Sequence, residues 1–381
     1  MSFRLVDQQA VVVCQRPCEE AHEYLRRYAD ESLAEGSRAW DTCEKPWSIN
    51  MSLKDFEKLK VELKLDNPSR TADLMQPKYP MYAYNARTEL LTIRCTPSPF
   101  HESVTKIFSR ALIFATDMLP ASIGLRIGYT TLEIEDFRGI YRGSRQAPDF
   151  ALTLSSEEGI DFIKLVVEVG FGESYEELVQ EATKWLEGKP EVSVVVLLKL
   201  EETKSTGEDS MAALNAKDDK FACLDSANWT EFNASAIDLL EDFGPARFKG
   251  IEWVGKISTA YMEVWKRDAT GLAARVGNRY DFFAPFENTT PILHLSHFLR
   301  IAPEDDRPVV HTPTTVCRCL NDAIKELALH RCQKVMRARK SEASSPLEDK
   351  SDSKLLEAGP SGASNPLEDR TNKKSSESSH R

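Results

Sequence analysis

Three consecutive segments between residues 161 and 200 restrict the possible folds of this chain more than any other feature. The runs DFIKLVVEVGF (161–171) and VSVVVLLKL (192–200) are apolar and rich in β-branched residues, which is typical of strands buried on both faces. Between them, SYEELVQEATKWLEG is a predicted helix, because Ser174 and Glu177 form a capping box at its start and Gly188 stands at its end. A buried strand, a helix and a second buried strand in succession predict an α/β fold.

The sequence around this unit predicts the remaining elements of the fold. Before the unit lie strand-like segments at 79–85, 89–95, 125–137 and 147–155, and an amphipathic helix at 101–119. After it we expect a strand or hairpin at 251–271 and helices at 291–300 and 314–336. The prediction is therefore an α/β domain with a mixed sheet, in which the central elements follow the order helix, strand, strand, strand, helix, strand.

Both ends of the chain and one internal segment differ in composition from this domain. Residues 1–75 are polar, with apolar residues at helical spacing, and are predicted to form a helical N-terminal extension. The α/β domain then covers 76–335, with an exposed insertion at about 202–250 that contains one short helix, ASAIDLLEDFG. Residues 339–381 contain ASSPLEDK and its near copy ASNPLEDR and have few large apolar residues, so we expect a disordered tail with a duplicated PLED segment.

The composition limits the cellular setting and the partners of the protein. The 381 residues carry a formal net charge of −11, which disfavours a general nucleic-acid coat but permits a local basic groove. The sequence has no signal-peptide pattern and no apolar run long enough for a membrane span, so we expect an intracellular protein, cytoplasmic or nuclear, without a membrane partner. The eight cysteines are then expected to be reduced thiols, and no disulfide-linked partner is expected.

One carboxylate stands inside the first of the two apolar strands. An unpaired buried carboxylate is costly or becomes neutral, so Glu168 is expected to lie at an exposed sheet end, to pair with a base, or to hold a metal ion. Asp149 lies on the preceding predicted strand, where it can come to lie beside Glu168. Two adjacent carboxylates repel each other unless a cation lies between them, and Mg²⁺ prefers such oxygen ligands. The alternative is a surface-turn aspartate and a strand-end glutamate that pairs with a Lys or Arg.

The segments LLTIRCTPSPFHE, APDF, VVEVGFGESYEELVQEATKWLEG and VSVVVLLKL together resemble the PD-(D/E)xK nuclease superfamily, and in particular uncharacterised fungal members of it. The resemblance covers about residues 80–200. It implies a restriction-endonuclease-like α-β-β-β-α-β core and hydrolysis of phosphodiester bonds in DNA or RNA. It also implies that Asp149 and Glu168 hold Mg²⁺ (or Mn²⁺), with Glu102 as an accessory acid. His101, beside Glu102, is expected to be a capping or surface residue.

The chain departs from the motif at one position. The motif has a lysine two residues after the acid, whereas this chain has Gly170. Four side chains are candidates to replace that lysine: Gln180, Lys184, Lys199 and Lys164. Gln180 and Lys184 lie four apart on the helical face opposite its apolar residues, so they are predicted to be exposed to solvent. Besides a nuclease, the sequence is consistent with a degenerate nuclease-like domain that acts as a binding or scaffold module, and with an unrelated α/β interaction protein.

Overall fold

The computed structural model describes residues 17–33, 47–63, 81–94, 98–124, 126–203, 219–224, 233–283, 293–309 and 313–344. Among them, the residues up to Glu342 belong to one compact unit. The α-helices of the described ranges are α1 (Pro17–Leu33), α2 (Leu53–Leu63), α3 (Pro99–Asp117), α4 (Ala121–Gly124), α5 (Tyr175–Gly188) and α7 (Pro313–Ser344). Short 3-10 helices lie at Gly139–Tyr141, Asp219–Leu224, Ala234–Ala236, Leu295–His297 and Pro303–Asp305.

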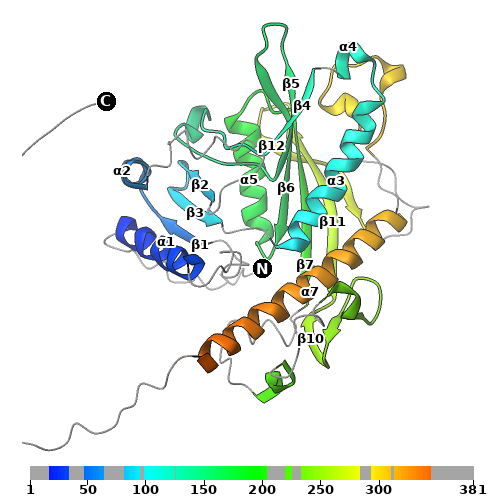
Figure 1. The fold of residues 1–381 in the computed structure, drawn as a ribbon. Coiled ribbons are helices and arrows are strands. Elements are labelled where there is room, and N and C mark those ends of the chain that lie inside the picture. Colours follow the sequence, from blue (N-terminus) through cyan, green and yellow to red (C-terminus); the bar gives the residue numbers. More distant parts are fainter. Residues whose placement is uncertain are drawn as a thin grey trace, which may run out of the picture. The chain divides into compact units, whose positions relative to one another are not determined.

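A six-stranded mixed sheet forms the centre of this unit (Figure 1). Its strand order is β12-β11-β7-β6-β5-β4, and the bounds are Ala273–Asp281, Ile257–Arg267, Val194–Glu202, Asp161–Phe171, Phe150–Ser155 and Ile127–Thr130. Only β6 and β7 pair in parallel, and α5 connects them, because parallel neighbours need a crossover connection. From α3 onward the main elements follow the predicted order of helix, three strands, helix and strand, with the single-turn α4 added after α3.

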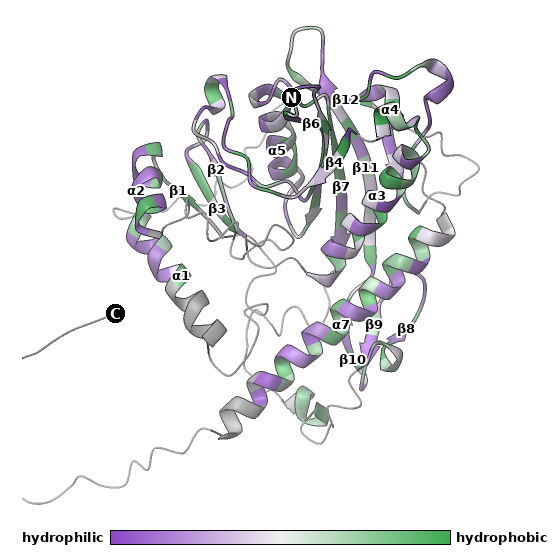
Figure 2. Cartoon of the chain, turned by 45° about the horizontal axis from the view of Figure 1, so that its top comes forward, coloured by the Kyte–Doolittle hydropathy of each residue, from purple (hydrophilic) through white to green (hydrophobic). Residues whose placement is uncertain are grey.

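Helices cover both faces of the central sheet. One face, which includes Val166, Val195 and Leu197, packs against α5 through residues such as Trp185. The opposite face packs against α3 and α7, and this larger cluster forms the main core. Figure 2 shows α3 and α7 with alternating hydrophobic and hydrophilic bands, as expected for helices that bury one side. The apolar runs of β6 and β7 follow from this arrangement, because strands covered on both faces have no solvent side.

The N-terminal residues are joined to the α/β domain rather than separated from it at residue 75. The strand β1 (Trp47–Asn50), which the sequence did not predict, pairs with β3 (Leu90–Arg94), and β3 pairs with β2 (Met81–Asn85). The helices α1 and α2 pack on this small sheet around a core of their own. Two backbone hydrogen bonds between Tyr84 and Arg145 (2.8 and 2.9 Å) fasten the small sheet to the segment that leads into β5.

Several sequence predictions for other segments need correction. In the segment 234–244, the expected helix is a 3-10 turn followed by β8 (Asp238–Leu239), which forms a third sheet with β9 (Ala246–Phe248) and β10 (Ile251–Val254). This insertion is not wholly exposed, because Phe221, Leu224 and Phe248 are buried in the main core. There β8 pairs with β9 in a short antiparallel hairpin, and this pairing overrides the local helical preference.

Three further boundaries differ from the predictions. In the described part of 291–300, only Leu295–His297 is helical, as a 3-10 turn, and the strand expected at 125–137 is confined to β4. The helix α7 continues to Ser344, beyond the predicted start of the tail at 339; residues 345–381, with most of the duplicated segment, lie outside the described residues.

None of the helices in the described ranges is both long and apolar enough to span a membrane. The thiols of Cys18, Cys317, Cys319 and Cys332 form no disulfide.

Candidate functional site

Asp149 and Glu168 lie on neighbouring strands and on the same side of the sheet. The β5–β6 register pairs Phe150 with Val167, so Asp149, directly before β5, follows that register to the position of Glu168. The amide of Val169 donates a hydrogen bond to Oδ2 of Asp149 at 2.7 Å, which fixes the aspartate against β6. Both acids are on the side of the sheet that faces α5, as the alternation of buried residues along β5 and β6 requires.

The carboxylate of Glu168 is fully buried and only half satisfied. Gln146 Nε2 (2.8 Å) and Trp185 Nε1 (2.5 Å) both donate hydrogen bonds to Oε1, whereas Oε2 is buried and accepts no hydrogen bond from the described residues. Burial, reinforced by the negative charges of Glu181 and Asp149, raises the pKa of Glu168 well above its usual range. A buried, half-satisfied acid of this kind is a site that a cation or a proton stabilises.

Asp149 has the opposite electrostatic character. Burial acts to raise its pKa, but the neighbouring His101, Arg94 and the amide of Val169 outweigh this, so the pKa of Asp149 lies below its usual value. His101 Nε2 is 3.2 Å from Oδ2 of Asp149. His101 therefore contacts the cluster of acids formed by Asp149, Glu168, Glu173 and Glu181 (the acid cluster) and is not simply a capping or surface residue. Burial lowers the pKa of His101, but the negative charge of Asp149 outweighs this effect and raises it.

Glu102 does not approach this pair in the way that the motif implies. Its carboxylate accepts a hydrogen bond from Lys106, one turn along α3, at 3.1 Å, and the side chain is 42% exposed. The first turn of α3 thus directs His101, rather than Glu102, to Asp149. The reason is the helical spacing, since adjacent residues on a helix point about 100° apart.

Arg94, at the end of β3, is the central cation of the cluster. Its guanidinium forms an ion pair with Glu181 of α5 and lies 3.5 Å from the carboxylate of Glu173, which precedes α5. Burial raises the pKa of Glu181 to about 7 although Arg94 opposes this effect. Arg94 lies within electrostatic range of Asp149 as well. One guanidinium from the small sheet therefore compensates carboxylates of α5 and of the loop before it.

Lys184 is buried, contrary to the prediction that it is exposed. Only 3% of its surface is accessible, and burial lowers the pKa of its amine to about 8 against the opposing charges of Glu181 and Glu168. Within the described part of the chain, no hydrogen bond or ion pair of the amine is recorded. The small sheet explains the burial, because it covers the side of α5 that sequence periodicity assigns to solvent; Gln180, four residues earlier, stays exposed.

A cavity of about 60 Å³ separates α5 from the small sheet, which is space for a few water molecules. The small sheet contributes Ser48, Ala83, Asn85, Leu90, Thr92 and Arg94, and α5 with its preceding loop contributes Glu173, Glu177, Gln180, Glu181 and Lys184. Sequence reasoning missed Arg94, Gln146 and Glu181. The available signal was the spacing of Glu177, Glu181 and Lys184 at i, i+4 and i+7, a charged stripe that resembles a solvated helix face.

The other lysine candidates are bound elsewhere. Lys199 is buried on β7, donates a hydrogen bond to the carbonyl of Glu173 at 2.7 Å and lies 3.3 Å from the carboxylate of Glu201. The ammonium of Lys164 lies over the ring of Phe162, 5.6 Å from its centroid. Lys184 is therefore the candidate whose amine lies within electrostatic range of Glu181 and Glu168.

The space beside Gly170 is already filled. A Cβ atom at this position would lie 3.1 Å from Leu178 Cδ2 and 3.6 Å from Lys199 Cδ. Contacts of this length leave no room for the longer side chain of a motif lysine without repacking.

The donor set of the two predicted acids fits a Mg²⁺ ion. Oε2 of Glu168 has no partner, and both recorded hydrogen bonds of Asp149 go to Oδ2, which leaves Oδ1 without one among the described residues. Mg²⁺ commonly takes one or two carboxylates and completes its shell with water and substrate phosphate. The described ranges contain no group of three or more His, Cys, Asp or Glu side chains arranged to hold a metal. The described residues thus offer Mg²⁺ two protein carboxylates.

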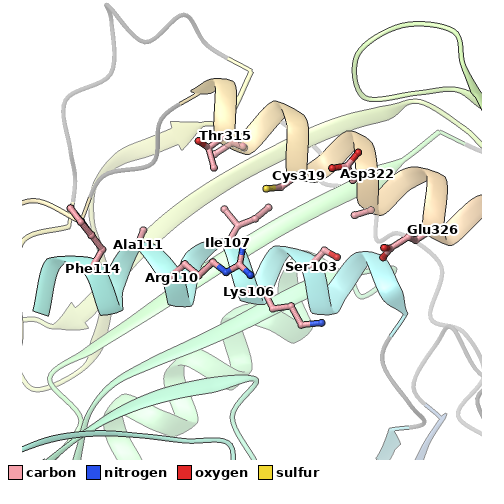
Figure 3. Close-up of a pocket in the computed structure, with 12 residues that line it drawn as sticks. Ser103, Lys106, Ile107, Arg110, Ala111, Phe114, Thr315, Cys319, Asp322 and Glu326 are labelled. Carbon is pink, nitrogen blue, oxygen red and sulfur yellow. The ribbon is translucent and has the colours of Figure 1, made fainter. Parts of the chain in front are cut away.

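A larger cavity of about 360 Å³ lies on the other face of the sheet, between α3 and α7 (Figure 3). Ile107 and Ala111 of α3 lie in it, and its charged side chains come in opposite signs from the two helices: Lys106 and Arg110 from α3, Asp322 and Glu326 from α7. It includes none of the buried acids, so we place the candidate site at the acid cluster. Neither models of protein families, nor curated proteins, nor solved structures give a match to this chain.

Proposed function

We propose that the protein is a Mg²⁺-dependent phosphodiester hydrolase that acts on DNA or RNA, with Asp149 and Glu168 as the metal ligands. The observation that carries the proposal is the pair of carboxylates at paired positions of β5 and β6, each with an oxygen that accepts no hydrogen bond from the described residues. Lys184 is buried, and its amine lies within electrostatic range of Glu168. The order of α3, β4, β5, β6, α5 and β7 agrees with the restriction-endonuclease-like core that the sequence resembles.

The residues of the chain divide the work in this proposal. Gln146 and Trp185 hold one oxygen of Glu168, and His101 and the Val169 amide hold one oxygen of Asp149, so each acid presents its other oxygen in a fixed position. A bound Mg²⁺ supplies Lewis-acid chemistry: it polarises the phosphate and makes water a better nucleophile. Preorganised ligands of this kind need little rearrangement when the ion binds.

Lys184 takes the role of the motif lysine from a different element. Its amine accepts the proton of the attacking water while the new oxygen–phosphorus bond forms and the bond to the leaving oxygen breaks. The leaving oxygen takes a proton from solvent, so the products are a phosphate monoester and an alcohol. The position two residues after Glu168 cannot supply this amine, because Leu178 and Lys199 occupy the space beside Gly170.

Cleavage of supercoiled plasmid and of single-stranded DNA and RNA oligonucleotides, with Mg²⁺ or Mn²⁺, tests the proposal. We expect Asp149→Asn, Glu168→Gln and Lys184→Met each to abolish metal-dependent cleavage. Lys189→Met is the matched control, because Lys189 is also a buried lysine at the α5 end but pairs with Asp136. Cleavage that survives in Glu168→Gln would overturn the proposed role of the acids.

The second candidate is a nuclease-like domain that binds a partner without cutting. The observation that favours it is the closed state of the site, since Glu168 is fully buried and the cavity beside Lys184 has space only for a few waters. This candidate would be supported if the protein neither binds Mn²⁺ nor cleaves any of these nucleic acids.

A further inference from the structure

Two arginines of the edge strand β12 are held by one buried carboxylate on the neighbouring strand. Glu263 of β11 is fully buried, and its carboxylate pairs with Arg275 at 3.0 Å and with Arg279 at 2.6 Å. Tyr175, at the start of α5, donates a further hydrogen bond to it at 2.9 Å, and Trp265 donates one at 3.0 Å. The two guanidiniums (the arginine pair) are thereby fixed relative to each other, while their side chains are 41% and 44% exposed.

The backbone of β12 changes its course opposite this carboxylate. The register between β11 and β12 shifts at Glu263, so residues 277–279 of β12 lie opposite this one residue of β11. Gly277 begins the bulge with a φ of 69°, in the left-handed region that glycine adopts readily. A bulge redirects the side chains beside it, and here the guanidinium of Arg279 reaches the carboxylate and lies 4.2 Å from the ring centroid of Tyr261.

Stability alone does not account for a buried acid with two arginines. Attraction within a buried ion pair repays the cost of desolvation only in part, and packed apolar side chains are often as stable in its place. One arginine neutralises Glu263, so the second leaves the group with a net positive charge at the surface. Each guanidinium has five N–H donors, of which Glu263 takes one in each case. Such a held, half-exposed arginine suits phosphate, which it binds through two parallel hydrogen bonds.

The arginine pair and the candidate site lie on the same side of the sheet. Glu168 of β6 and Glu263 of β11 both pair with Leu197 of β7, from its two sides, so their backbones lie about 10 Å apart. The helix α5 packs on Leu197 between them. The start of α5 reaches both places, because Tyr175 bonds to Glu263 and Glu173, two residues earlier, lines the cavity of the candidate site.

We propose that Arg275 and Arg279 bind a backbone phosphate of the nucleic-acid substrate, a few nucleotides from the bond that is cleaved. The inference rests on the proposed function, because its ligand is the substrate of that reaction. A strand of a duplex advances about 3.4 Å per nucleotide, so a separation of about 10 Å corresponds to about three nucleotides. The strand crosses the start of α5. Because the contacts are to phosphate, they position the substrate and read no base sequence.

Fluorescence anisotropy of labelled single-stranded DNA and RNA and of duplex DNA tests this proposal with the full-length protein. The titrations are done in EDTA, so that no metal-dependent cleavage occurs, and at several salt concentrations. We expect Arg275→Gln and Arg279→Gln each to weaken binding roughly tenfold, because a hydrogen bond to a charged group is lost. Each is also expected to reduce the slope of log affinity against log salt by about 0.7–0.9. Arg247→Gln is the matched control, since Arg247 is 46% exposed and pairs with Glu252 in the third sheet.

A double variant separates the phosphate contact from the overall charge and from folding. Loss of one arginine alone changes the net charge and weakens the pairing of the buried Glu263. Glu263→Gln combined with Arg279→Gln keeps the net charge of the wild-type protein and removes the buried carboxylate, so it serves where Arg279→Gln does not fold. We expect this double variant still to bind roughly tenfold more weakly, because the contact to phosphate is missing.

The outcomes separate this inference from the proposed function. Wild-type affinity and salt slope in both single variants, or wild-type affinity in the double variant, would overturn the inference even if the wild-type protein cleaves nucleic acid. An equal loss in Arg247→Gln would also overturn it, because overall charge would then explain the binding. Binding that depends on the arginine pair, in a protein that cleaves none of these nucleic acids, would overturn the proposed hydrolysis and support the phosphate site.

Discussion

Restoring the motif lysine at position 170 is expected to damage the fold instead of improving the site. A Cβ atom on Gly170 would lie 3.1 Å from Cδ2 and 3.4 Å from Cδ1 of Leu178, which is fully buried. The rest of a lysine side chain would then displace Leu178 or the stem of Lys199, 3.6 Å away. Overpacking of a core costs about 1–3 kcal/mol, so we expect Gly170→Lys to lower the free energy of unfolding by that amount.

Urea unfolding followed by tryptophan fluorescence measures this loss, because Trp185 is fully buried next to the site. A second variant tests whether Leu178 is the cause. Leu178→Ala alone is expected to cost about 2–5 kcal/mol through the cavity that it leaves. The lysine stem fills part of that cavity, so the double variant is expected to be more stable than the sum of the single changes by about 1 kcal/mol.

Two results would refute this reasoning. If Gly170→Lys unfolds at the wild-type urea concentration, the space beside Gly170 is not filled as the structure shows. If the effects of Gly170→Lys and Leu178→Ala simply add, the two side chains do not compete for that space. We also expect no gain in metal-dependent cleavage from Gly170→Lys, because in the proposed function Lys184 of α5 already supplies the amine.

Three further predictions concern stability. Glu263→Gln removes a fully buried carboxylate that pairs with two arginines of β12, and we expect a loss of about 1–3 kcal/mol at neutral pH in urea unfolding. Because the folded protein lowers the pKa of Glu263 below 4.5, its contribution is present above pH 4.5 and is lost as the pH falls through the lower folded pKa; an unchanged acid profile in Glu263→Gln would contradict this. Arg331→Met removes the buried guanidinium that binds both oxygens of Glu202 at 2.8 and 2.9 Å, so we expect a loss of about 3–5 kcal/mol, and a loss under 1 kcal/mol would contradict the pairing. Ser174→Ala removes the side-chain half of the α5 capping box, with an expected loss of about 1 kcal/mol in thermal or urea unfolding and none if the cap is not formed in solution.

The central unit of the fold is predictable from sequence because its signals are local. The apolar runs of β6 and β7, the capping box at Ser174 and the spacing along α3 each depend on residues that are near neighbours in the chain. The structure confirms these elements and the mixed α/β class. The strand β1 was not predicted, because its partner β3 lies far away in the chain: Trp47 pairs with Ile93. The helix expected at 234–244 was wrong although the pairing partner of that segment, β9, is near in the chain.

The candidate site divides in the same way. The sequence alone singled out Glu168, since a carboxylate inside an apolar strand stands out without any knowledge of its neighbours, and it named Asp149 as the acid on the preceding strand that can lie beside it. It also named Lys184, but as an exposed residue. Only the tertiary structure buries that lysine, places Arg94 against Glu181 from 87 residues away, and turns His101 rather than Glu102 to Asp149. The physical reason is that helical periodicity defines the faces of α5 but not what covers them, and here a small sheet covers the charged face that an isolated helix would expose to water.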